Sequence, residues 1–142
     1  MCPAFTVHPV SWHDGEPLLR AVRESVFIRE QQVPEELEWD GLDAECRHIL
    51  ALSHQGDAIG CARLTPQAQI GRMSVLPQWR QLKVGTAMIE ALLADARGRR
   101  MPEVKVHAQV HAIPFYRRFD FVEHGERFMD AGIPHIEMRL KL

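Results

Sequence analysis

The sequence predicts an α+β fold in which helices flank one mixed β-sheet. Two observations carry this expectation. Apolar residues recur at helical spacing over residues 83–100, whereas several shorter segments alternate between apolar and polar side chains or are continuously apolar, which is typical of strands. The predicted order is strand, helix, three strands, helix, strand, helix and two strands, which is not a regular βαβ repeat. The 142 residues are expected to form one domain, 1–142.

The N-terminal part is expected to hold four strands and one helix. The helix is predicted over 16–28, where Pro17 suits a first helical turn. Its apolar face comprises Leu18, Leu19, Val22, Val26 and Phe27. The Val33-Pro34 pair is expected to end this region. The strands are predicted at residues 5–10, 48–53, 58–64 and 69–76, and the second and third of them are expected to form a hairpin.

The C-terminal part is expected to contain two helices and three strands. Residues 83–100 form the clearest helix, with three arginines near its end, where cations interact favourably with the helix dipole. A strand over 104–110 and a short helix over 113–119 follow. The final strands are predicted at 121–128 and 136–140 and are joined through Gly132-Ile133-Pro134.

Composition and charge narrow the class of protein. The formal net charge of -2 gives no indication of a nucleic-acid partner or an anionic membrane partner. Cys2, Cys46 and Cys61 are odd in number and far apart, which argues against a disulfide framework and favours a reducing compartment. Neither a signal peptide nor a membrane span is expected, so a cytoplasmic location is predicted. The oligomeric state is left open, with a homodimer as one option.

The first candidate binding site is the strand, loop and helix start within residues 70–89. The N-terminus of a helix offers unpaired N–H groups and positive dipole charge, both of which suit a phosphate. Gly85 lets the backbone approach a ligand closely, and Arg80 and Lys83 add positive charge. An ordinary strand-to-helix turn with a packing glycine explains this segment equally well, because one glycine is a weak signal.

The second candidate lies within residues 107–121. Tyr116 is the only tyrosine of the chain, and a phenol beside a ligand can donate a proton to a leaving group. Taken alone, Tyr116 is better explained as a core aromatic residue whose hydroxyl is satisfied. Each stretch is therefore informative only in combination with the other.

Together the two stretches resemble the GNAT superfamily, the Gcn5-related N-acetyltransferases. The run Arg80-Gln81-Leu82-Lys83-Val84-Gly85 matches the first and last positions of the family motif Arg/Gln-x-x-Gly-x-Gly/Ala at the start of a long helix. Gln109, Ala112 and Tyr116 fall at the spacings of the later motif Asn-x-x-Ala-x-x-x-Tyr, and Phe121 occupies its phenylalanine position.

The likeness extends to a bacterial, ElaA-like subgroup. Its signatures here are the stretches Val26 to Pro34, His107 to Tyr116 and Gly132 to His135, so that the match covers nearly the whole chain. Two residues depart from the family pattern. Lys83 stands in place of the first motif glycine, and Asp120 in place of the glycine before the phenylalanine. Asp120 is tolerable if its turn is left-handed, because Asp is among the better non-glycine residues there.

The resemblance implies a mostly antiparallel sheet of about seven strands, splayed between the fourth and fifth, with acetyl-CoA in the opening. It implies that the reaction transfers the acetyl group to a primary amine of a small molecule or peptide, which attacks the thioester directly without a metal. Tyr116 would protonate the CoA thiolate, and amides near Val75 would polarise the thioester carbonyl. The residues implied to bind acetyl-CoA are Met73, Ser74, Val75, Arg80, Gln81, Lys83, Val84, Gly85, Thr86, Gln109 and Phe115.

The acceptor amine must lose a proton before it attacks. Glu30, His111 and His135 are the candidate bases, and Glu30 leads slightly because it belongs to the subgroup signature. For each of them a surface or capping role is the simpler explanation. Cys46 and His48 have no third ligand nearby in sequence, so a zinc site is not expected.

An acidic run over residues 35–45 is predicted to form a loop or a short helix. By analogy it would lie near the acceptor side, where it could attract a cationic amine. A solvated surface is the favoured interpretation, because charge runs usually face water.

Two alternatives to an acetyltransferase remain open at this point. The first is a non-catalytic acyl-CoA-binding module with the same fold, which Lys83 in the motif keeps under consideration. The second is a structural or interaction domain without a CoA site.

Overall fold

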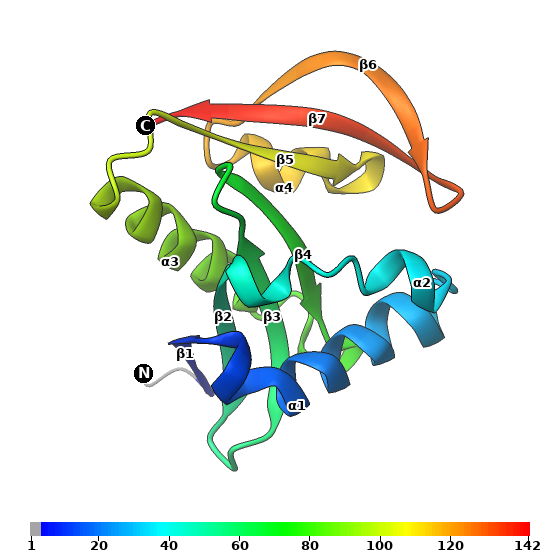
Figure 1. Ribbon diagram of the computed structural model, residues 1–142, viewed down its shortest axis with the longest axis vertical. Coiled ribbons are helices and arrows are strands. Elements are labelled where there is room, and N and C mark those ends of the chain that lie inside the picture. Colours follow the sequence, from blue (N-terminus) through cyan, green and yellow to red (C-terminus); the bar gives the residue numbers. More distant parts are fainter. Residues whose placement is uncertain (1–3) are drawn as a thin grey trace.

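The computed structural model describes residues 4–142 and contains a seven-stranded sheet (Figure 1). The strands are β1 (Phe5–Val10), β2 (Arg47–Ser53), β3 (Ala58–Leu64), β4 (Gln69–Val75), β5 (Glu103–Gln109), β6 (Val122–Asp130) and β7 (Ile133–Lys141). Their order is β1-β2-β3-β4-β5-β7-β6, and each neighbouring pair is antiparallel except β4 and β5. The expected α+β fold with a mostly antiparallel sheet is confirmed. Cys2 lies outside the described residues.

The helices connect the strands at three places. They are α1 (Trp12–Arg23), which continues as a π-helical segment (Glu24–Glu30), α2 (Glu35–Glu38), α3 (Val84–Gly98) and α4 (Ile113–Arg117). Short 3-10 turns occupy Asp43–Glu45, Pro77–Trp79 and Val110–Ala112. The hairpin of β2 and β3 and the long helix before β5 lie where the sequence predicts them.

Helices α1 and α3 pack against opposite faces of the first four strands. Leu50 of β2 belongs to a buried cluster with Leu19 of α1. Its neighbours Ile49 and Ala51 belong to the larger core with Met88 of α3. Because successive strand residues point to opposite faces, the continuously apolar sequence of β2 reflects burial on both sides. Each such side chain stabilises the fold by roughly 1.5–3 kcal/mol.

The sheet opens between β4 and β5. These parallel strands pair only at Gln69 with Lys105 and at Ile70 with Val106, and beyond these positions β4 pairs with β3 alone. The register between β3 and β4 shifts at this point, where Arg72 has a φ of 50°. A bulge bends its strand, and bulges are frequent next to active sites. The expected splay between the fourth and fifth strands is confirmed.

The first helix begins earlier than expected. The Oγ of Ser11 accepts a hydrogen bond of 3.0 Å from the N–H of Asp14, and this cap starts α1 at Trp12. Pro17 therefore lies inside the helix and not in its first turn, and Leu18 is exposed. The prediction was wrong here because it used Pro17 as the start signal and overlooked the serine cap.

The last strand also begins earlier than expected. The turn before β7 consists of Ala131 and Gly132, both with positive φ, and Ile133 and Pro134 already pair with β6. The pairing of β7 with β5 ends at His135, so Pro134 has a strand neighbour on one side only. A proline is tolerated at such a position because its missing N–H is not needed for a second ladder.

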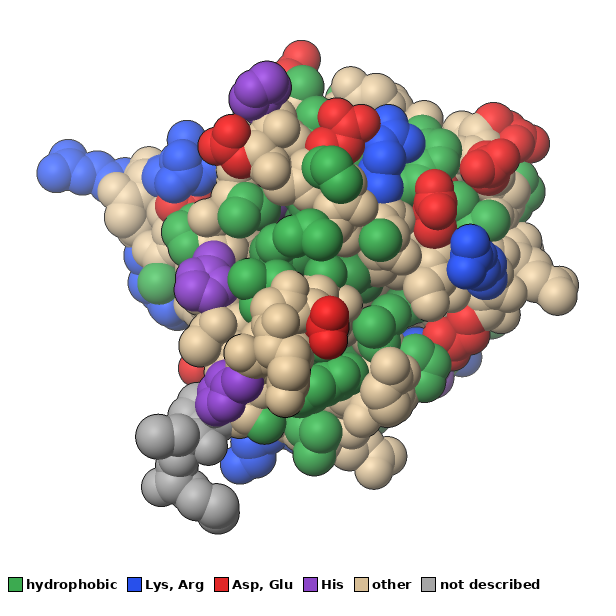
Figure 2. All heavy atoms as spheres, turned by 90° about the horizontal axis from the view of Figure 1, so that it is seen from below, with side chains coloured by type: hydrophobic (Ala, Val, Ile, Leu, Met, Phe, Trp, Pro, Cys, Tyr) green, Lys and Arg blue, Asp and Glu red, His purple; other side chains and the backbone are tan. Residues whose placement is uncertain are grey.

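No helix within residues 4–142 is long and apolar enough to cross a membrane. The face shown in Figure 2 carries hydrophobic side chains near its middle and side chains of both charges toward its margins. This face therefore presents no continuous basic surface of the kind that binds a nucleic-acid backbone.

Candidate active site

The loop of residues 80–86 lies between the end of β4 and the body of α3. Gln81 and Lys83 have left-handed backbones, with φ of 63° and 67°. None of the N–H groups of residues 81–86 donates to a protein acceptor within residues 4–142. Lys83 is the N-cap of α3 but makes no side-chain capping bond. The loop therefore presents a set of unpaired donors beside the positive end of a 15-residue helix.

The two departures from the family pattern both have left-handed backbones, a conformation that favours glycine. Lys83 has φ 67° and ψ 20°, and Asp120 has a φ of 71° in the turn after α4. The left-handed turn expected at Asp120 is confirmed. A left-handed backbone costs a non-glycine residue roughly 1–2 kcal/mol, so Lys83 keeps the shape of the loop at some cost in stability.

Arg80 and Glu30 form an ion pair that closes one edge of this region. Nη1 and Nη2 of Arg80 donate to the two carboxylate oxygens of Glu30 at 2.7 and 2.6 Å, and Nε donates to the carbonyl oxygen of Val75 at 2.9 Å. The hydrogen bonds from Arg80 lower the pKa of Glu30 below its usual range. Arg80 was expected to bind phosphate and Glu30 to transfer a proton. The structure shows that these two residues contact each other.

The end of β4 supplies the backbone that faces the opening. Ser74 and Val75 pair with Cys61 and Gly60 of β3. Ser74 is buried, and its hydroxyl lies 3.3 Å from the Sγ of Cys61, whereas Met73 and Val75 are half-buried. The side of these residues that faces β5 has no strand partner, so their backbone groups are available to an extended ligand.

Helix α4 brings the second motif against the first. A Cβ added at Gly85 would lie 3.4 Å from Cζ of Phe115, so α4 packs closely on the start of α3. Tyr116 is 7% exposed and makes edge contacts with the rings of Phe115 and Phe121, at centroid distances of 5.1 and 5.6 Å. Burial raises the pKa of Tyr116 to about 12, so its phenol stays protonated at neutral pH.

Gln109 links several elements at the point where β5 ends. Its Nε2 donates to Oε1 of Gln31 at 2.9 Å, and its Oε1 lies 2.7 Å from Nε2 of His111. Because that oxygen can only accept, His111 donates through Nε2. His135 faces Gln109 across the β5–β7 ladder. The sequence analysis did not single out Gln31, although it lies in the subgroup stretch 26–34 that could have indicated it.

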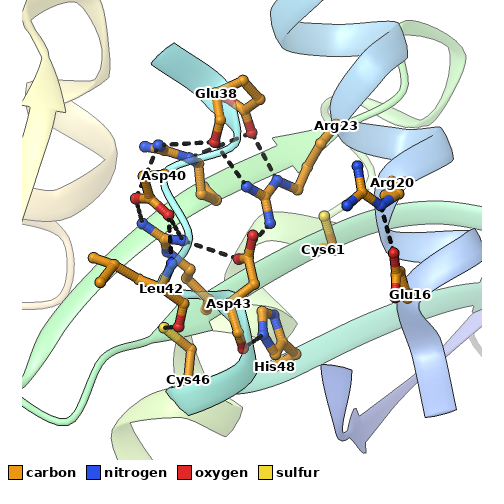
Figure 3. Close-up of polar contacts among 12 residues, drawn as sticks. Glu16, Arg20, Arg23, Glu38, Asp40, Leu42, Asp43, Cys46, His48 and Cys61 are labelled. Carbon is orange, nitrogen blue, oxygen red and sulfur yellow. Dashed lines mark hydrogen bonds and ion pairs between the residues drawn. The ribbon is translucent and has the colours of Figure 1, made fainter. Parts of the chain in front are cut away.

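The acidic run is only in part the solvated surface that was expected, because Glu35, Glu36 and Glu45 are exposed but Glu38 and Asp43 are buried. Glu38 and Asp43 are 3% and 5% exposed, and their carboxylates belong to a closed cycle of ion pairs beside α1 (Figure 3). This ion-pair ring contains, in cyclic order, Arg23, Asp43, Arg63, Asp40, Arg72 and Glu38. The arginines come from α1, β3 and β4, and none of them was considered as a partner when the acidic run was read in isolation.

Each carboxylate of the ring bridges two arginines. Nε of Arg23 donates to Glu38 at 2.7 Å, and Nη1 of Arg23 donates to Asp43 at 2.7 Å. Asp43 also accepts from Nη1 of Arg63 at 2.9 Å. Burial raises the pKa of Asp40, but the hydrogen bond from Arg63 and the remaining contacts outweigh it and bring that pKa to about 2. Against the effect of burial, the arginines also lower the pKa of Asp43, whereas burial raises the pKa of Glu38. The ring thus holds the segment from α2 to Glu45 against β3 and β4.

The candidate residues come from five elements around the splay. These are the loop 80–86, α4, the π-helical segment, the end of β4 and the end of β5. Within residues 4–142 no group of three His, Cys, Asp or Glu side chains is arranged to hold a metal ion. Cys46 and Cys61 are free thiols in buried positions.

Comparisons with known proteins define the class. Residues 16–142 match the acetyltransferase (GNAT) domain family. The uncharacterized N-acetyltransferase YjcF of Bacillus subtilis is 36% identical over 121 residues, which are 82% of this chain and 86% of YjcF. The chain therefore belongs to the GNAT acetyltransferase family and is an acyltransferase.

Within this family the chain is similar to ElaA. Protein ElaA of Escherichia coli is 31% identical over 129 residues, 84% of this chain and 83% of ElaA. The crystal structure of E. coli ElaA has a TM-score of 0.83 at 28% identity and covers 94% of this chain and 98% of that chain. A GNAT family acetyltransferase from Elizabethkingia anophelis, solved with acetyl-CoA bound, shares the fold, with a TM-score of 0.71, 14% identity and coverage of 98% and 99%.

Proposed function

We propose that the protein transfers the acetyl group of acetyl-CoA to a primary amine of a small molecule or peptide. One observation carries this proposal. Strands β4 and β5 separate after two residue pairs, and the unpaired N–H groups of residues 81–86 follow the end of β4 that has no β5 partner. An extended thioester with a pyrophosphate at one end matches both features, because strand backbone binds an amide-rich chain and a helix N-terminus binds phosphate.

Binding of acetyl-CoA is assigned to backbone on both sides of the opening. Met73, Ser74 and Val75 would pair with the pantetheine arm, and amides near Val75 would polarise the thioester carbonyl. The pyrophosphate would lie on the amides from Gln81 to Thr86, with Gly85 in close approach. The side chains of Arg80, Lys83, Gln109 and Phe115 complete this proposed site.

Tyr116 is assigned the role of proton donor to the departing CoA thiolate. Burial keeps the phenol protonated at neutral pH, and a hydrogen-bond donor in a water-excluded site stabilises a negative charge that develops beside it. Within residues 4–142 the Tyr116 hydroxyl has no hydrogen-bond partner, and burial is the only cause of its raised pKa. The hydroxyl is therefore free to interact with a ligand in the opening.

Glu30 is a weaker candidate for the base that deprotonates the acceptor amine than the sequence suggested. Both of its carboxylate oxygens accept from Arg80, and its lowered pKa makes it a weaker base. Glu30 could act only after Arg80 turns to a phosphate. His111 keeps one free ring nitrogen, Nδ1, and remains a candidate.

The proposal is tested by mixing the protein with acetyl-CoA and a panel of primary amines and measuring the free thiol released. Acetyl-CoA-dependent thiol release that requires an amine is the expected result. A thermal-shift titration with CoA accompanies it, since a ligand at about 100 times its Kd adds roughly 2.7 kcal/mol to stability. A CoA shift without turnover would indicate a non-catalytic acyl-CoA-binding module, and no shift would indicate a domain without a CoA site.

A further inference from the structure

Direct acetyl transfer needs a group that takes a proton from the acceptor, because a primary amine is mostly protonated at neutral pH. Such a group needs a free lone pair, a fixed orientation and a place near the thioester carbon. His135 was one of three candidates in the sequence, and the structure separates it from the other two. The following inference rests on the proposed function.

The position of His135 is set by the sheet. It pairs with Gln109 across the β5–β7 ladder and with Phe128 across the β6–β7 ladder. Residues that face each other in an antiparallel pair point their side chains to the same face, with Cβ atoms about 4.5–5.5 Å apart. Gln109 reaches Gln31, the residue after the π-helical segment, so His135 lies on the same sheet face as this contact, beside the end of β5 and one strand away from β4.

The protonation pattern of His135 follows from its contact. Its Nδ1 lies 2.7 Å from the carbonyl oxygen of Ile133. A carbonyl oxygen only accepts, so Nδ1 carries the proton, and Nε2 of the neutral ring has a free lone pair. Within residues 4–142 no hydrogen-bond partner is found for Nε2 of His135, and this atom is not among the fully buried side-chain nitrogens without a hydrogen bond. Nε2 therefore keeps some contact with solvent, although the residue is only 8% exposed.

Packing fixes the ring and shields it from bulk water. The ring of Phe128 stacks on that of His135, with centroids 5.8 Å apart and planes at 22°. Phe128 in turn meets His107 edge-on at 5.2 Å. The charged and titratable groups on this face include Lys105, His107, His124, Glu137 and Arg139. Glu137 accepts from Nε of Arg139 at 2.6 Å and lies 3.3 Å from Nε2 of His107.

The other two candidates meet fewer of the requirements. The carboxylate of Glu30 is bound on both oxygens by Arg80. His111 lies in the exposed turn after β5, where water can reach its free Nδ1 and compete for the proton. His135 alone among the three combines a free nitrogen, a place within a strand ladder and shielding by an apolar ring.

We propose that Nε2 of His135 is the general base that deprotonates the acceptor ammonium. The proton moves from the ammonium to Nε2 and leaves the amine with its electron pair. That pair forms the bond to the thioester carbon, and the carbonyl electrons move to oxygen. When the carbonyl re-forms, the carbon–sulfur bond breaks and its electrons leave with the CoA thiolate. The thiolate is protonated, the new amide loses its extra proton, and His135 returns its proton to solvent.

The test compares the wild type with His135→Asn. The amide nitrogen of asparagine takes the place of Nδ1 and can still donate to Ile133, so this variant removes the base and keeps the hydrogen bond. With acetyl-CoA and benzylamine or spermidine as probes, kcat/KM for the amine is expected to fall about 100-fold or more at pH 7. The KM for acetyl-CoA should stay unchanged. The deficit should shrink as pH rises, because free amine then forms in solution.

Two further variants separate the outcomes. His54→Asn, in the turn between β2 and β3, is the matched control and should keep wild-type kinetics. Unchanged kcat/KM and an unchanged pH profile for His135→Asn would overturn the proposal, as would a loss seen in His111→Asn instead. A wild type that releases no thiol with any amine would reject the acetyltransferase function itself, and the base with it.

If His135→Asn fails to fold, a measurement on the wild type still tests the proposal. In protein with ¹⁵N-labelled histidine, NMR distinguishes protonated from unprotonated ring nitrogens. The expected spectrum at high pH shows His135 with a proton on Nδ1 and none on Nε2. A proton on Nε2 would remove the lone pair and overturn the assignment.

Discussion

The ion-pair ring and the 80–86 loop both contact strand β4, and they differ in how their polar groups are satisfied. Arg72 of β4 belongs to the ring, where three carboxylates each bridge two guanidinium groups. At the C-terminal end of β4, the carbonyl oxygen of Val75 accepts from Arg80 of the loop. The N–H groups of residues 81–86 have no protein acceptor within the described chain.

The difference shows which polar groups indicate a binding site and which only stabilise the fold. Buried charges that satisfy one another hold a segment in place and need nothing further. The unpaired donors beside a helix N-terminus, next to two left-handed residues, are the groups that we propose to bind a ligand. In the sequence both regions are simply charged, and only the contacts distinguish them.

The largest effect on stability is expected from a substitution that breaks the ion-pair ring. Asp43→Asn keeps the shape of the side chain but leaves Arg23 and Arg63 short of a counter-charge in a buried site. Breaking a buried pair costs about 3–5 kcal/mol, so the free energy of unfolding in urea should fall by this amount. Glu36→Gln, at an exposed position of the same acidic run, is the control and should change stability by less than about 0.5 kcal/mol. Similar losses in both variants would show that the ring does not act as a unit.

The second prediction concerns the splay, where a change should affect catalysis and spare the fold. Tyr116→Phe removes only a hydroxyl and is expected to lower kcat by about ten- to a thousandfold, with little change in KM for acetyl-CoA. The melting temperature should stay near that of the wild type, because the ring contacts with Phe115 and Phe121 remain. An unchanged kcat, under conditions where chemistry limits turnover, would remove Tyr116 from the mechanism.

The sequence predicted the fold better than it predicted the site. The periodicity of hydrophobic residues predicted the β2–β3 hairpin and helix α3. The spacing of motif residues indicated the loop and Tyr116. Both signals lie within short stretches of sequence. The ring could not be predicted this way. Arg23, Arg63 and Arg72 are far from the acidic run in sequence, and only the packing of α1, β3 and β4 brings them to it.

The candidate bases show the same limit. Nothing in the sequence pairs Glu30 with Arg80, 50 positions away, or places His135 opposite Gln109. These relations depend on strand register and on how the helices cross the sheet. The motif residues were therefore found, but their hydrogen-bond partners, which decide their chemistry, were not.

The third prediction uses pH to test whether Asp40 contributes to the ring in its charged form. Its pKa of about 2 lies below the ordinary value of 3.8, so its stabilisation is present above pH 3.8 and is lost as pH falls through 2. Asp40 is exposed, so solvent screening reduces this contribution to below about 2 kcal/mol when complete. In urea unfolding, the stability difference between wild type and Asp40→Asn should shrink by up to about 1 kcal/mol from pH 5 to pH 3. A difference that stays constant with pH would show that the carboxylate charge is not what stabilises this position.

The smallest expected effect separates two contributions of Lys83, its strained backbone and its charge. At φ 67° a glycine avoids the clash of Cβ, and its greater freedom in the unfolded chain offsets part of the gain. Lys83→Gly should therefore raise the free energy of unfolding by about 0.5–1 kcal/mol, whereas Lys83→Ala, which keeps a Cβ, should not. Both variants lose the ammonium, so both should bind CoA more weakly by about 1 kcal/mol and with a smaller dependence on salt. Urea unfolding and calorimetric titration at low and high salt measure the two effects separately. Equal stability of the two variants would show that the loop is not strained, and wild-type affinity and salt dependence in both would place the ammonium away from the CoA phosphates.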